Sequence, residues 1–208
     1  MSEITCINHP IVKHKLGVLR NKNTDSNNFR TVMAELTRLI AYEASRDLSV
    51  KLVNIETPLV ETKVNEIDNA PVAVSIMRAG NGMLESVLSI LPMAQAGHIG
   101  IYRDKFINST VEYYFRLPKN MKGRDVYLLD PMIATGDTAV ACLERLNQCG
   151  VRNINILSIL LSESAGKRIM DRFSNVKIYC AGIEKELDLN GYLVPGMGDV
   201  GSRLYTEA

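Results

Sequence analysis

The sequence predicts an α/β fold in which a mainly parallel twisted sheet is flanked by helices. Apolar stretches of strand length alternate with amphipathic stretches of helical length, which is the pattern of βαβ units. The expected strands cover 71–76, 97–103, 126–130, 153–161 and 176–180. The chain has 208 residues, 46% of them hydrophobic, which suits one domain with a full core. Ligands bind at the carboxyl ends of parallel strands, so residues that follow these strands are the site candidates.

Composition excludes several classes of function. Lys and Arg number 24 and Asp and Glu 23, a formal net charge of +1, so the chain lacks the basic surface that duplex nucleic acid requires. No apolar run approaches membrane-spanning length and the N-terminus has no signal-peptide pattern, so a cytoplasmic protein is expected. The cysteines form no C-x-x-C pair and are expected to be reduced thiols rather than metal ligands or nucleophiles.

The first seventy residues predict one long helix. Residues 9–16 contain two His and two Lys, which suggests metal or phosphate binding, but no carboxylate or further His is near, so a solvated arm or packed connector is favoured. A helix capped by Ser26 or Asn27 should extend to about Ser45. Its buried stripe is Phe29, Val32, Met33, Leu36, Leu39 and Ile40. Residues 50–70 suggest edge strands and turns.

Two of the strands lead into arginines. Residues 71–76 precede Met77-Arg78-Ala79-Gly80-Asn81-Gly82-Met83, where glycines permit close backbone approach and Arg78 supplies a fork of donors to phosphate. The alternative is a plain turn with a surface arginine. Strand 97–103 ends at Arg103, and 104–120 resembles a projecting hairpin. Its aromatic residues 113–115 are either a stacking platform for nucleic acid or, more in keeping with a hairpin, a face that packs on a partner subunit.

From Val126 to Thr138 the sequence predicts a strand, an acidic residue at the end of that strand, a turn and the first residues of a helix. The backbone N–H groups of 135–138 would point at a bound phosphate, and the dipole of the helix over 137–148 favours an anion there. Asp130 can accept hydrogen bonds from a ribose diol. The alternative is an ordinary turn in which Thr or Asp only caps the helix. No G-x-x-x-x-G-K-[ST] is present and no G-x-G-x-x-G follows the first strong strand, which argues against a nucleotide triphosphatase or a Rossmann dehydrogenase.

Beyond the central motif, a helix is expected to begin at Ser162 or Ser164, between the last two strands. The segment 189–201 contains four glycines and a proline, which is typical of a shaped loop, with a disordered tail as the alternative.

Four motifs resemble one known family. Leu128-Leu129-Asp130-Pro131-Met132-Ile133-Ala134-Thr135-Gly136 resembles the phosphoribosyl-pyrophosphate (PRPP) loop of type I phosphoribosyltransferases, in the Asp-Pro form of the uracil phosphoribosyltransferases. The opening at 9–17, the Arg-Ala-Gly-Asn-Gly-Met run at 78–83 and the segment at 190–201 resemble that family in the same order. The resemblance covers nearly the whole chain. It implies a type I phosphoribosyltransferase fold with a projecting β-hairpin flap and a C-terminal base-binding hood.

The implied enzyme is a glycosyltransferase (pentosyltransferase, EC 2.4.2.9) of pyrimidine salvage that converts uracil and PRPP to UMP and diphosphate. Two alternatives remain: a phosphoribosyltransferase for another base, or a nucleotide-sensing RNA-binding regulator on the same fold. The resemblance implies one domain over 1–208, with an N-terminal arm at 1–25, the flap hairpin at 104–120 and the uracil-binding hood at 187–208. It also implies a homodimer or higher homo-oligomer, with GTP as an effector to be tested and no nucleic acid or membrane partner.

The resemblance assigns the site residue by residue. The catalytic set is Asp130, Arg78 and Arg103. The PRPP set is Arg78, Arg103, Asp130, Pro131, Met132, Ile133, Ala134, Thr135, Gly136, Asp137, Thr138 and Asp199. The uracil set is Tyr192, Leu193, Gly198, Asp199 and Val200, with the backbone reading the edge of the base. Mg²⁺ would be held through PRPP and waters, with no direct protein cage. No general base for uracil N1 is evident.

The sequence departs from the family at three places. Residues 104–109 are poorer in Glu, Thr and Pro than the usual start of the flap, and Val200 replaces a common Ala. Asp137 stands where the family usually has Gly or another uncharged residue. A carboxylate there should repel a phosphate dianion, while it gains from the helix dipole. We therefore expect Asp137→Gly to bind PRPP more tightly at low salt and to be slightly less stable.

Overall fold

The computed structural model describes residues 3–104 and 109–205. An eight-stranded sheet forms its centre, in the order β1-β10-β9-β7-β4-β5-β6, with β8 paired to β9. The bounds are β1 (Glu3–Cys6), β10 (Val176–Glu184), β9 (Asn153–Ser162), β7 (Asp125–Leu129), β4 (Val72–Ile76), β5 (Ala96–Asp104), β6 (Ser109–Arg116) and β8 (Met132–Ile133). All pairs are parallel except that of β5 with β6. The predicted α/β fold class is confirmed.

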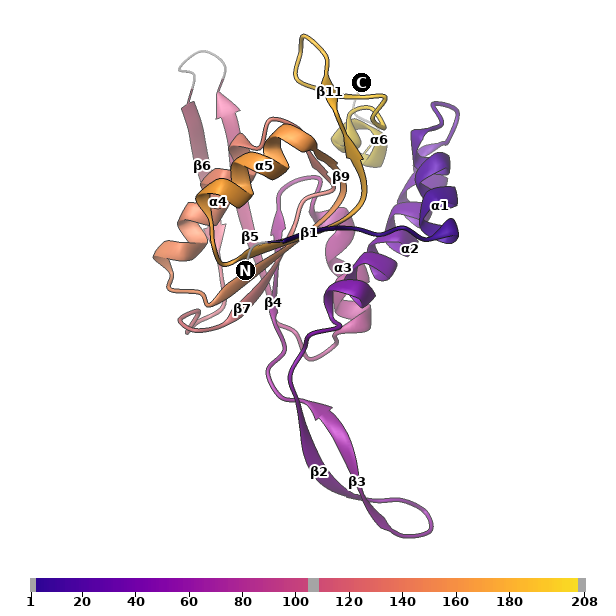
Figure 1. Cartoon of the computed structure of the whole chain (residues 1–208), viewed down its shortest axis with the longest axis vertical. Helices are drawn as coiled ribbons and strands as arrows, with labels where there is room; N and C mark the ends of the chain where they lie inside the picture. Colours follow the sequence, from indigo (N-terminus) through magenta and orange to yellow (C-terminus); the bar gives the residue numbers. More distant parts are fainter. Residues whose placement is uncertain (1–2, 105–108, 206–208) are drawn as a thin grey trace.

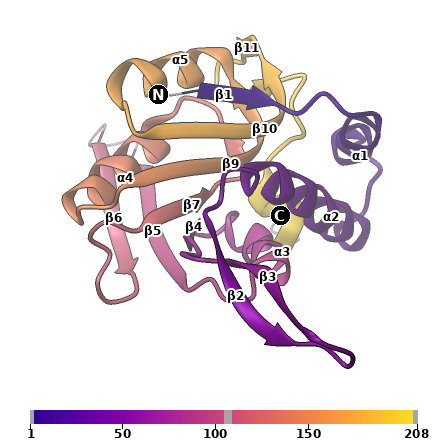
Figure 2. The ribbon, with the colours of Figure 1, turned by 60° about the horizontal axis from the view of Figure 1, so that its bottom comes forward.

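Helices cover both faces of this sheet (Figures 1 and 2). One face carries α1 (Pro10–Arg20), α2 (Ser26–Ala44), α3 (Asn81–Ile90) and α6 (Val200–Tyr205), and the other carries α4 (Asp137–Gln148) and α5 (Glu163–Arg172). Strand β4 shows how the two cores are separated. Ala73 packs with the first set of helices, whereas Val72 and Val74 pack with the second. Successive side chains of a strand point to opposite faces, so a strand buried on both sides is apolar throughout.

Residues 10–20 form a helix that was not predicted from the sequence. Residues 9–16 were read as an arm or connector, but they open α1. The ring Nδ1 of His9 accepts a hydrogen bond from the backbone N–H of Ile11 at 3.1 Å, and Pro10 occupies the first turn, where no N–H is needed. Val12 and Leu16 are buried at helical spacing. The histidine is therefore a helix cap.

The other predicted helices are confirmed in position, with one change of cap. Helix α2 begins at Ser26, slightly earlier than a cap at Ser26 or Asn27 would give, and its cap is Asp25, whose Oδ1 accepts from the N–H of Asn28 at 2.9 Å. Helix α4 covers the predicted 137–148. Helix α5 is capped by Ser162, one of the two candidates.

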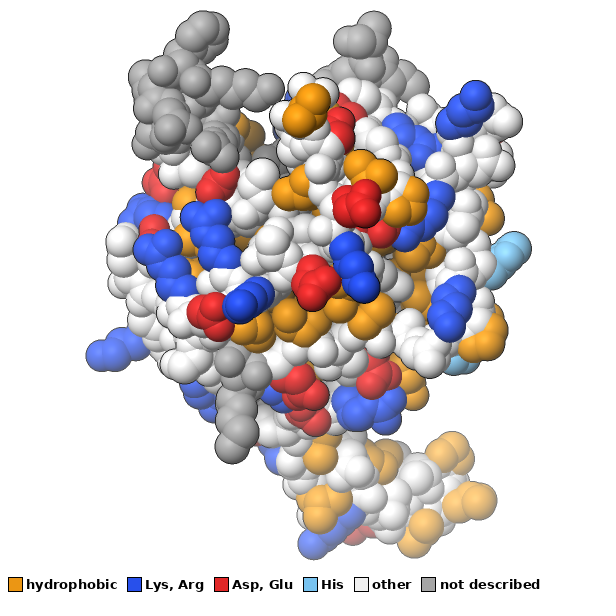
Figure 3. Space-filling model, turned by 45° about the horizontal axis from the view of Figure 1, so that its top comes forward, with side chains coloured by type: hydrophobic (Ala, Val, Ile, Leu, Met, Phe, Trp, Pro, Cys, Tyr) orange, Lys and Arg blue, Asp and Glu red, His pale blue; other side chains and the backbone are white. Residues whose placement is uncertain are grey.

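A two-stranded hairpin, β2 (Val50–Glu56) and β3 (Glu61–Ile67), projects from the body (Figure 1). The sequence analysis placed edge strands here, but the pair forms a separate antiparallel sheet. Its apolar side chains face solvent: Leu52 is 67% exposed and Leu59 is 95% exposed. Figure 3 shows hydrophobic side chains gathered on this hairpin, at the bottom of the view. Exposed apolar patches of this kind are common at protein–protein interaction sites.

The topology decides where a site can lie. Strands β4, β5 and β7 are adjacent and parallel, so their carboxyl ends reach the same edge of the sheet. A short pair, β11 (Glu186–Leu187) with β12 (Leu193–Val194), follows β10. Among the helices of residues 3–104 and 109–205, none has the length and apolar character needed to cross a membrane.

Candidate active site

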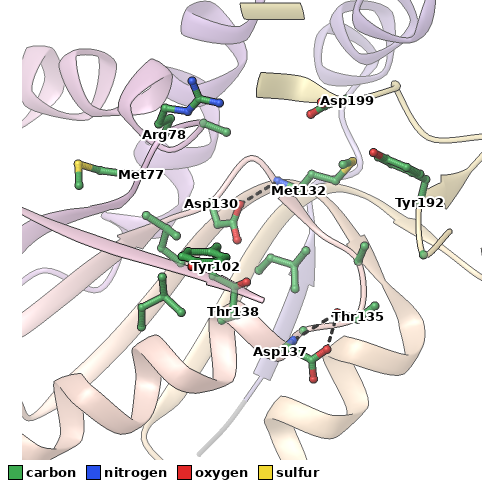
Figure 4. Close-up of a pocket in the computed structure, with 18 of the residues that line it drawn as sticks. Met77, Arg78, Tyr102, Asp130, Met132, Thr135, Asp137, Thr138, Tyr192 and Asp199 are labelled. Atoms are coloured by element: carbon green, nitrogen blue, oxygen red, sulfur yellow. Dashed lines mark hydrogen bonds between the residues drawn. The ribbon is translucent and has the colours of Figure 1, made fainter. Parts of the chain in front are cut away.

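A cavity of about 720 Å³ opens at the carboxyl edge of the sheet. It is lined by the loop after β4, by the end of β5, by the segment from β7 to α4 and by the C-terminal segment. The lining residues are Ile76, Met77, Arg78, Ala79, Ile101, Tyr102, Asp130, Met132, Ile133, Ala134, Thr135, Gly136, Asp137, Thr138, Ala139, Asn190, Gly191, Tyr192 and Asp199. In Figure 4, Asp130 lies between the labelled residues Arg78 and Asp199 on one side and Thr135, Asp137 and Thr138 on the other.

The loop before α4 has the geometry of an anion site. Gly136, the residue before the helix, has φ of +81°, a left-handed conformation that glycine adopts without strain. A Cβ there would lie 3.0 Å from the Cβ of Ala165, so α5 also leaves little room. Ser162, the cap of α5, donates its hydroxyl to the carbonyl of Ala134 at 2.5 Å. The start of α4 therefore lines the cavity from a loop fixed by its neighbours, and the N-terminus of a helix favours a bound anion.

The loop of Arg78 is pressed against the end of β7. A Cβ built on Gly80 would lie 2.4 Å from the carbonyl oxygen of Leu129 and 2.6 Å from that of Ile76. The Arg78 carbonyl accepts from the N–H of Asn81 at 3.1 Å and from the hydroxyl of Tyr205 at 3.1 Å. Glycine at position 80 is what allows this loop to come close to the strand that carries Asp130.

We expect Gly80→Ala to lower the free energy of unfolding by about 1–3 kcal/mol, because its methyl group meets fixed backbone oxygens. Urea denaturation measures this change. Gly17→Ala is the control, since a Cβ at position 17 meets nothing within 4 Å. Equal stability of Gly80→Ala and wild type would show that the two strand ends are not tightly packed.

Asp130 is the titratable group at the centre of the cavity. Burial raises the pKa of its carboxyl from 3.8 to about 7, opposed by a hydrogen bond that Oδ1 accepts from the backbone N–H of Met132 at 3.3 Å. Part of the side chain remains accessible from the cavity. A desolvated carboxyl that faces an open cavity is typical of a group that meets a ligand.

The C-terminal segment forms the remaining wall. The Asp188 carboxylate accepts from the N–H of Asn190 at 2.9 Å and from that of Tyr192 at 2.8 Å, which shapes the turn. Two arginines fix the residues that follow. Arg20 donates to the carbonyl of Gly196 at 2.8 Å, and Arg203 donates to that of Met197 at 2.9 Å. The loop is thereby held to α1 and to its own helix.

Most of the predicted phosphate-site residues come together at this cavity. Arg78, Asp130, Asp199 and all residues from Met132 to Thr138 line it. Pro131 does not; it is buried, and its carbonyl accepts from the N–H groups of Ile159 and Leu160. Arg103 lies in β5, and its side chain is outside what the structure describes, so its role stays a prediction.

The predicted uracil-site residues divide into two groups. Tyr192 and Asp199 line the cavity. The side chains of Leu193 and Val200 are buried in the core, and Gly198 has φ of +76°; none of the three is among the lining residues. The prediction for these three concerned backbone groups, and it stays a prediction.

Sequence reasoning missed several lining residues. They are Ile76, Met77, Ala79, Ile101, Tyr102, Ala139, Asn190 and Gly191. Asn190 and Gly191 directly precede Tyr192 in a segment already singled out, so proximity in sequence could have identified them. Tyr102 ends in the cavity because β5 lies beside β4, and that is a fact of the strand order.

The residues present suit an indirectly held magnesium ion. In the described ranges no group of three or more His, Cys, Asp or Glu is placed to hold a metal. Asp130, Asp137 and Asp199 are the carboxylates that line the cavity. Mg²⁺ keeps several waters and takes one or two carboxylates together with phosphate oxygens, so this donor set fits such an ion.

A mainly parallel sheet with a cavity at its carboxyl edge, lined by the loops after β4 and β7, is the arrangement of the type I phosphoribosyltransferases. A solved structure of a hypoxanthine-guanine phosphoribosyltransferase from Bacillus anthracis has this fold, with a TM-score of 0.52 at 9% identity over 76% of this chain and 80% of that one. A protein from Aquifex aeolicus superposes with a TM-score of 0.93 at 32% identity, covering 99% of both chains.

Sequence comparison gives the particular family. Residues 6–206 match the family model described as uracil phosphoribosyltransferase. Curated uracil phosphoribosyltransferases of Polaromonas naphthalenivorans and Finegoldia magna are 43% and 42% identical over 206 residues, covering 99% of this chain and 99% of each relative. The chain belongs to the uracil phosphoribosyltransferase family.

Proposed function

We propose that this chain transfers the phosphoribosyl group of PRPP to uracil, forming UMP and diphosphate. One observation carries the proposal. A single cavity brings Arg78, Asp130 and the N-terminal turn of α4 together with the Tyr192 segment. PRPP has a phosphate at each end of a ribose, and the cavity offers an anion loop on each side of an acid. The names of the curated relatives support the choice of uracil.

Each group has a task in this reaction. The N–H groups of 135–138 hold the 5′-phosphate, and Asp130 accepts hydrogen bonds from the ribose hydroxyls. Cleavage of the bond from C1 to diphosphate generates positive charge on the ribose ring and negative charge on the leaving group. Arg78, with Arg103 as its expected companion, stabilises the leaving diphosphate. Magnesium held through PRPP and waters would neutralise more of that charge.

The experiment is the formation of UMP from uracil and PRPP, followed by chromatography. Cytosine, hypoxanthine and orotate are tested in parallel, since a phosphoribosyltransferase for another base would prefer one of them. GTP added to the same assay tests the proposed effector. Absence of turnover with all four bases, together with salt-dependent binding of RNA, would favour the regulatory alternative.

We also propose how the chain is divided into segments and in which compartment it is found. The chain acts as one phosphoribosyltransferase domain over 1–208, with an arm at 1–25, a flap at 104–120 and a uracil-binding hood at 187–208. The tip of the flap, 105–108, is outside the described residues. Cys6, Cys142, Cys149 and Cys180 are free thiols, which supports a reducing compartment such as the cytoplasm.

We propose further that the chain forms a homodimer or higher homo-oligomer through the β2–β3 hairpin. Val50, Leu52, Leu59 and Val60 are each more than half exposed on that hairpin. Leu52→Glu should raise the dissociation constant between subunits at least about tenfold, because a buried unpaired carboxylate costs more than about 1.4 kcal/mol.

Light scattering after gel filtration measures this change. Lys63→Glu, an exposed polar position on the same hairpin, is the matched control and should leave the mass unchanged. A wild-type protein that is monomeric at micromolar concentration contradicts the proposal, as does a Leu52→Glu variant with the wild-type mass.

A further inference from the structure

Helix α5 supports the loop that leads into α4, residues 134–138, called the phosphate loop below. Its cap residue Ser162 donates to the carbonyl of Ala134 at 2.5 Å. Nearly two turns further on, Arg168 Nη1 donates to the carbonyl of Thr135 at 3.3 Å and to Asp137 Oδ1 at 2.7 Å. Arg168 is not among the residues that line the cavity, whereas Thr135 and Asp137 are. The arginine therefore acts on a ligand through the loop.

The contacts of Asp137 tie its charge to this arginine. Besides Arg168, its carboxylate accepts the hydroxyl hydrogen of Thr135, with Thr135 Oγ1 3.0 Å from Oδ2 (Figure 4). The expectation from the sequence treated Asp137 as an isolated negative charge beside a phosphate dianion. The structure gives it a cation at 2.7 Å, with the Asp137 side chain 19% exposed and that of Arg168 45% exposed. The positive charge of Arg168 thus offsets the negative charge of Asp137.

We propose that Arg168 is a positioning residue of the phosphate loop, which neutralises Asp137 and fixes the carbonyl of Thr135 so that the N–H groups of 135–138 face the 5′-phosphate. The inference rests on the proposed function of the cavity. Asp137 alone opposes a dianion, and Arg168 alone favours it. With both residues present, the affinity for the 5′-phosphate stays close to that of an uncharged loop. The ion pair also makes the loop more rigid.

Binding of UMP by isothermal titration at low salt tests this charge balance. Arg168→Gln should weaken UMP binding about fivefold, because it removes one positive charge that lies beside the carboxylate of Asp137. Asp137→Asn should tighten it about two- to fivefold. The double variant Asp137→Asn/Arg168→Gln should return to within about twofold of wild type. The loss in Arg168→Gln should shrink as salt rises, since screening weakens the repulsion.

Two controls make the result specific. Arg172 lies one turn beyond Arg168 on α5 and pairs with Glu144 of α4, with side chains 51% and 41% exposed. Arg172→Gln thus removes a similar ion pair between the same two helices and should leave UMP binding unchanged. Uridine lacks the phosphate, so its binding should not respond to Arg168→Gln.

The two single variants are expected to change the affinity for UMP in opposite directions, which distinguishes this role from a purely structural one. If Asp137→Asn and Arg168→Gln both weaken UMP binding and the double variant is no better, the pair only braces the loop and the inference is wrong. Equal affinity of Arg168→Gln and wild type also overturns it.

Hydrogen exchange of the ligand-free protein tests the positioning role without reference to the reaction. Amides 135–138 should exchange faster in Arg168→Gln than in wild type or Arg172→Gln, and equal rates would contradict the role. A wild-type protein that binds no UMP would overturn the proposed function of the cavity, whereas a wild type that binds UMP with unaltered variants would overturn only the role of Arg168.

Discussion

Arg78→Ala is expected to lower kcat/KM for PRPP about a hundredfold while the fold stays intact. Arg78 lies on the loop after β4 and lines the cavity. A charged donor directed at a leaving diphosphate in a site that excludes water is worth about 2–4 kcal/mol in the transition state. Its backbone carbonyl, which accepts from Asn81 and Tyr205, is unaffected by removal of the side chain. The fold should therefore tolerate the change.

Steady-state kinetics with varied PRPP measures the effect, with circular dichroism as the check on folding. Arg38→Ala is the control, because Arg38 is also exposed, does not line the cavity and forms a hydrogen bond to Ser89 on the neighbouring α3, at 3.2 Å. An Arg78→Ala enzyme within threefold of wild type would remove this residue from the site.

Asp130→Asn should lower kcat by about ten- to a hundredfold and change the affinity for PRPP much less. Hydrogen bonds to a charged group contribute about 1.5–3 kcal/mol, and this one should strengthen as positive charge develops on the ribose. Single-turnover kinetics and a separate PRPP binding measurement distinguish the two effects. Asp125→Asn is the control, since Asp125 lies at the opposite end of the same strand and pairs with Arg152. A loss of PRPP affinity with an unchanged kcat would make Asp130 a ground-state contact only.

The pH dependence follows from the raised pKa of Asp130. The ionised carboxyl is a much stronger hydrogen-bond acceptor than the protonated acid, so kcat/KM for PRPP should rise as the pH passes about 7. The free energy of unfolding should fall as the pH rises. Between the ordinary value of 3.8 and about 7 the folded protein binds the proton that the unfolded chain has lost, so this group lowers stability as the pH rises through that window.

Comparison with Asp130→Asn isolates this contribution. The variant should match wild type in stability near pH 4 and exceed it above pH 7, while its activity profile lacks the rise near 7. Thermal unfolding at pH 4 and pH 8 measures the difference. A variant less stable than wild type at pH 8 would show that the carboxylate is well solvated in the folded protein.

Local patterns were sufficient to predict the centre of the molecule. Strand β7, Asp130, the turn and helix α4 follow one another without a break, and each depends on neighbours in sequence: an apolar run, a glycine at the left-handed position and buried residues at helical spacing. The same holds for α2 and for the cap of α5. In contrast, α1 was missed because the charges of residues 9–16 drew the interpretation away from the apolar spacing of Val12 and Leu16, which was present in the sequence.

The parts that could not be predicted depend on packing between distant segments. Helix α6 has six residues, and its Leu204 is buried against α2, so tertiary contacts rather than local preference stabilise it. The pairing of Asp137 with Arg168 exists because α5 lies beside the phosphate loop. No spacing in the sequence indicates which of the arginines on α5 reaches it.

The pairing of β1 with β10 has a consequence for how the chain reaches its native state. Glu3 is in register with Lys177 and Cys6 with Cys180. The first strand can therefore pair only after a segment near the other end of the described chain is in place. Parallel pairs with such large separation close slowly, because the entropy of a long loop is lost before any hydrogen bond is gained. Until β1 docks, β10 presents an open edge of unpaired N–H and C=O groups, which can pair with other chains. Refolding at high protein concentration should therefore lose material to aggregation through this edge, and the N-terminal strand is the segment that ends that exposure.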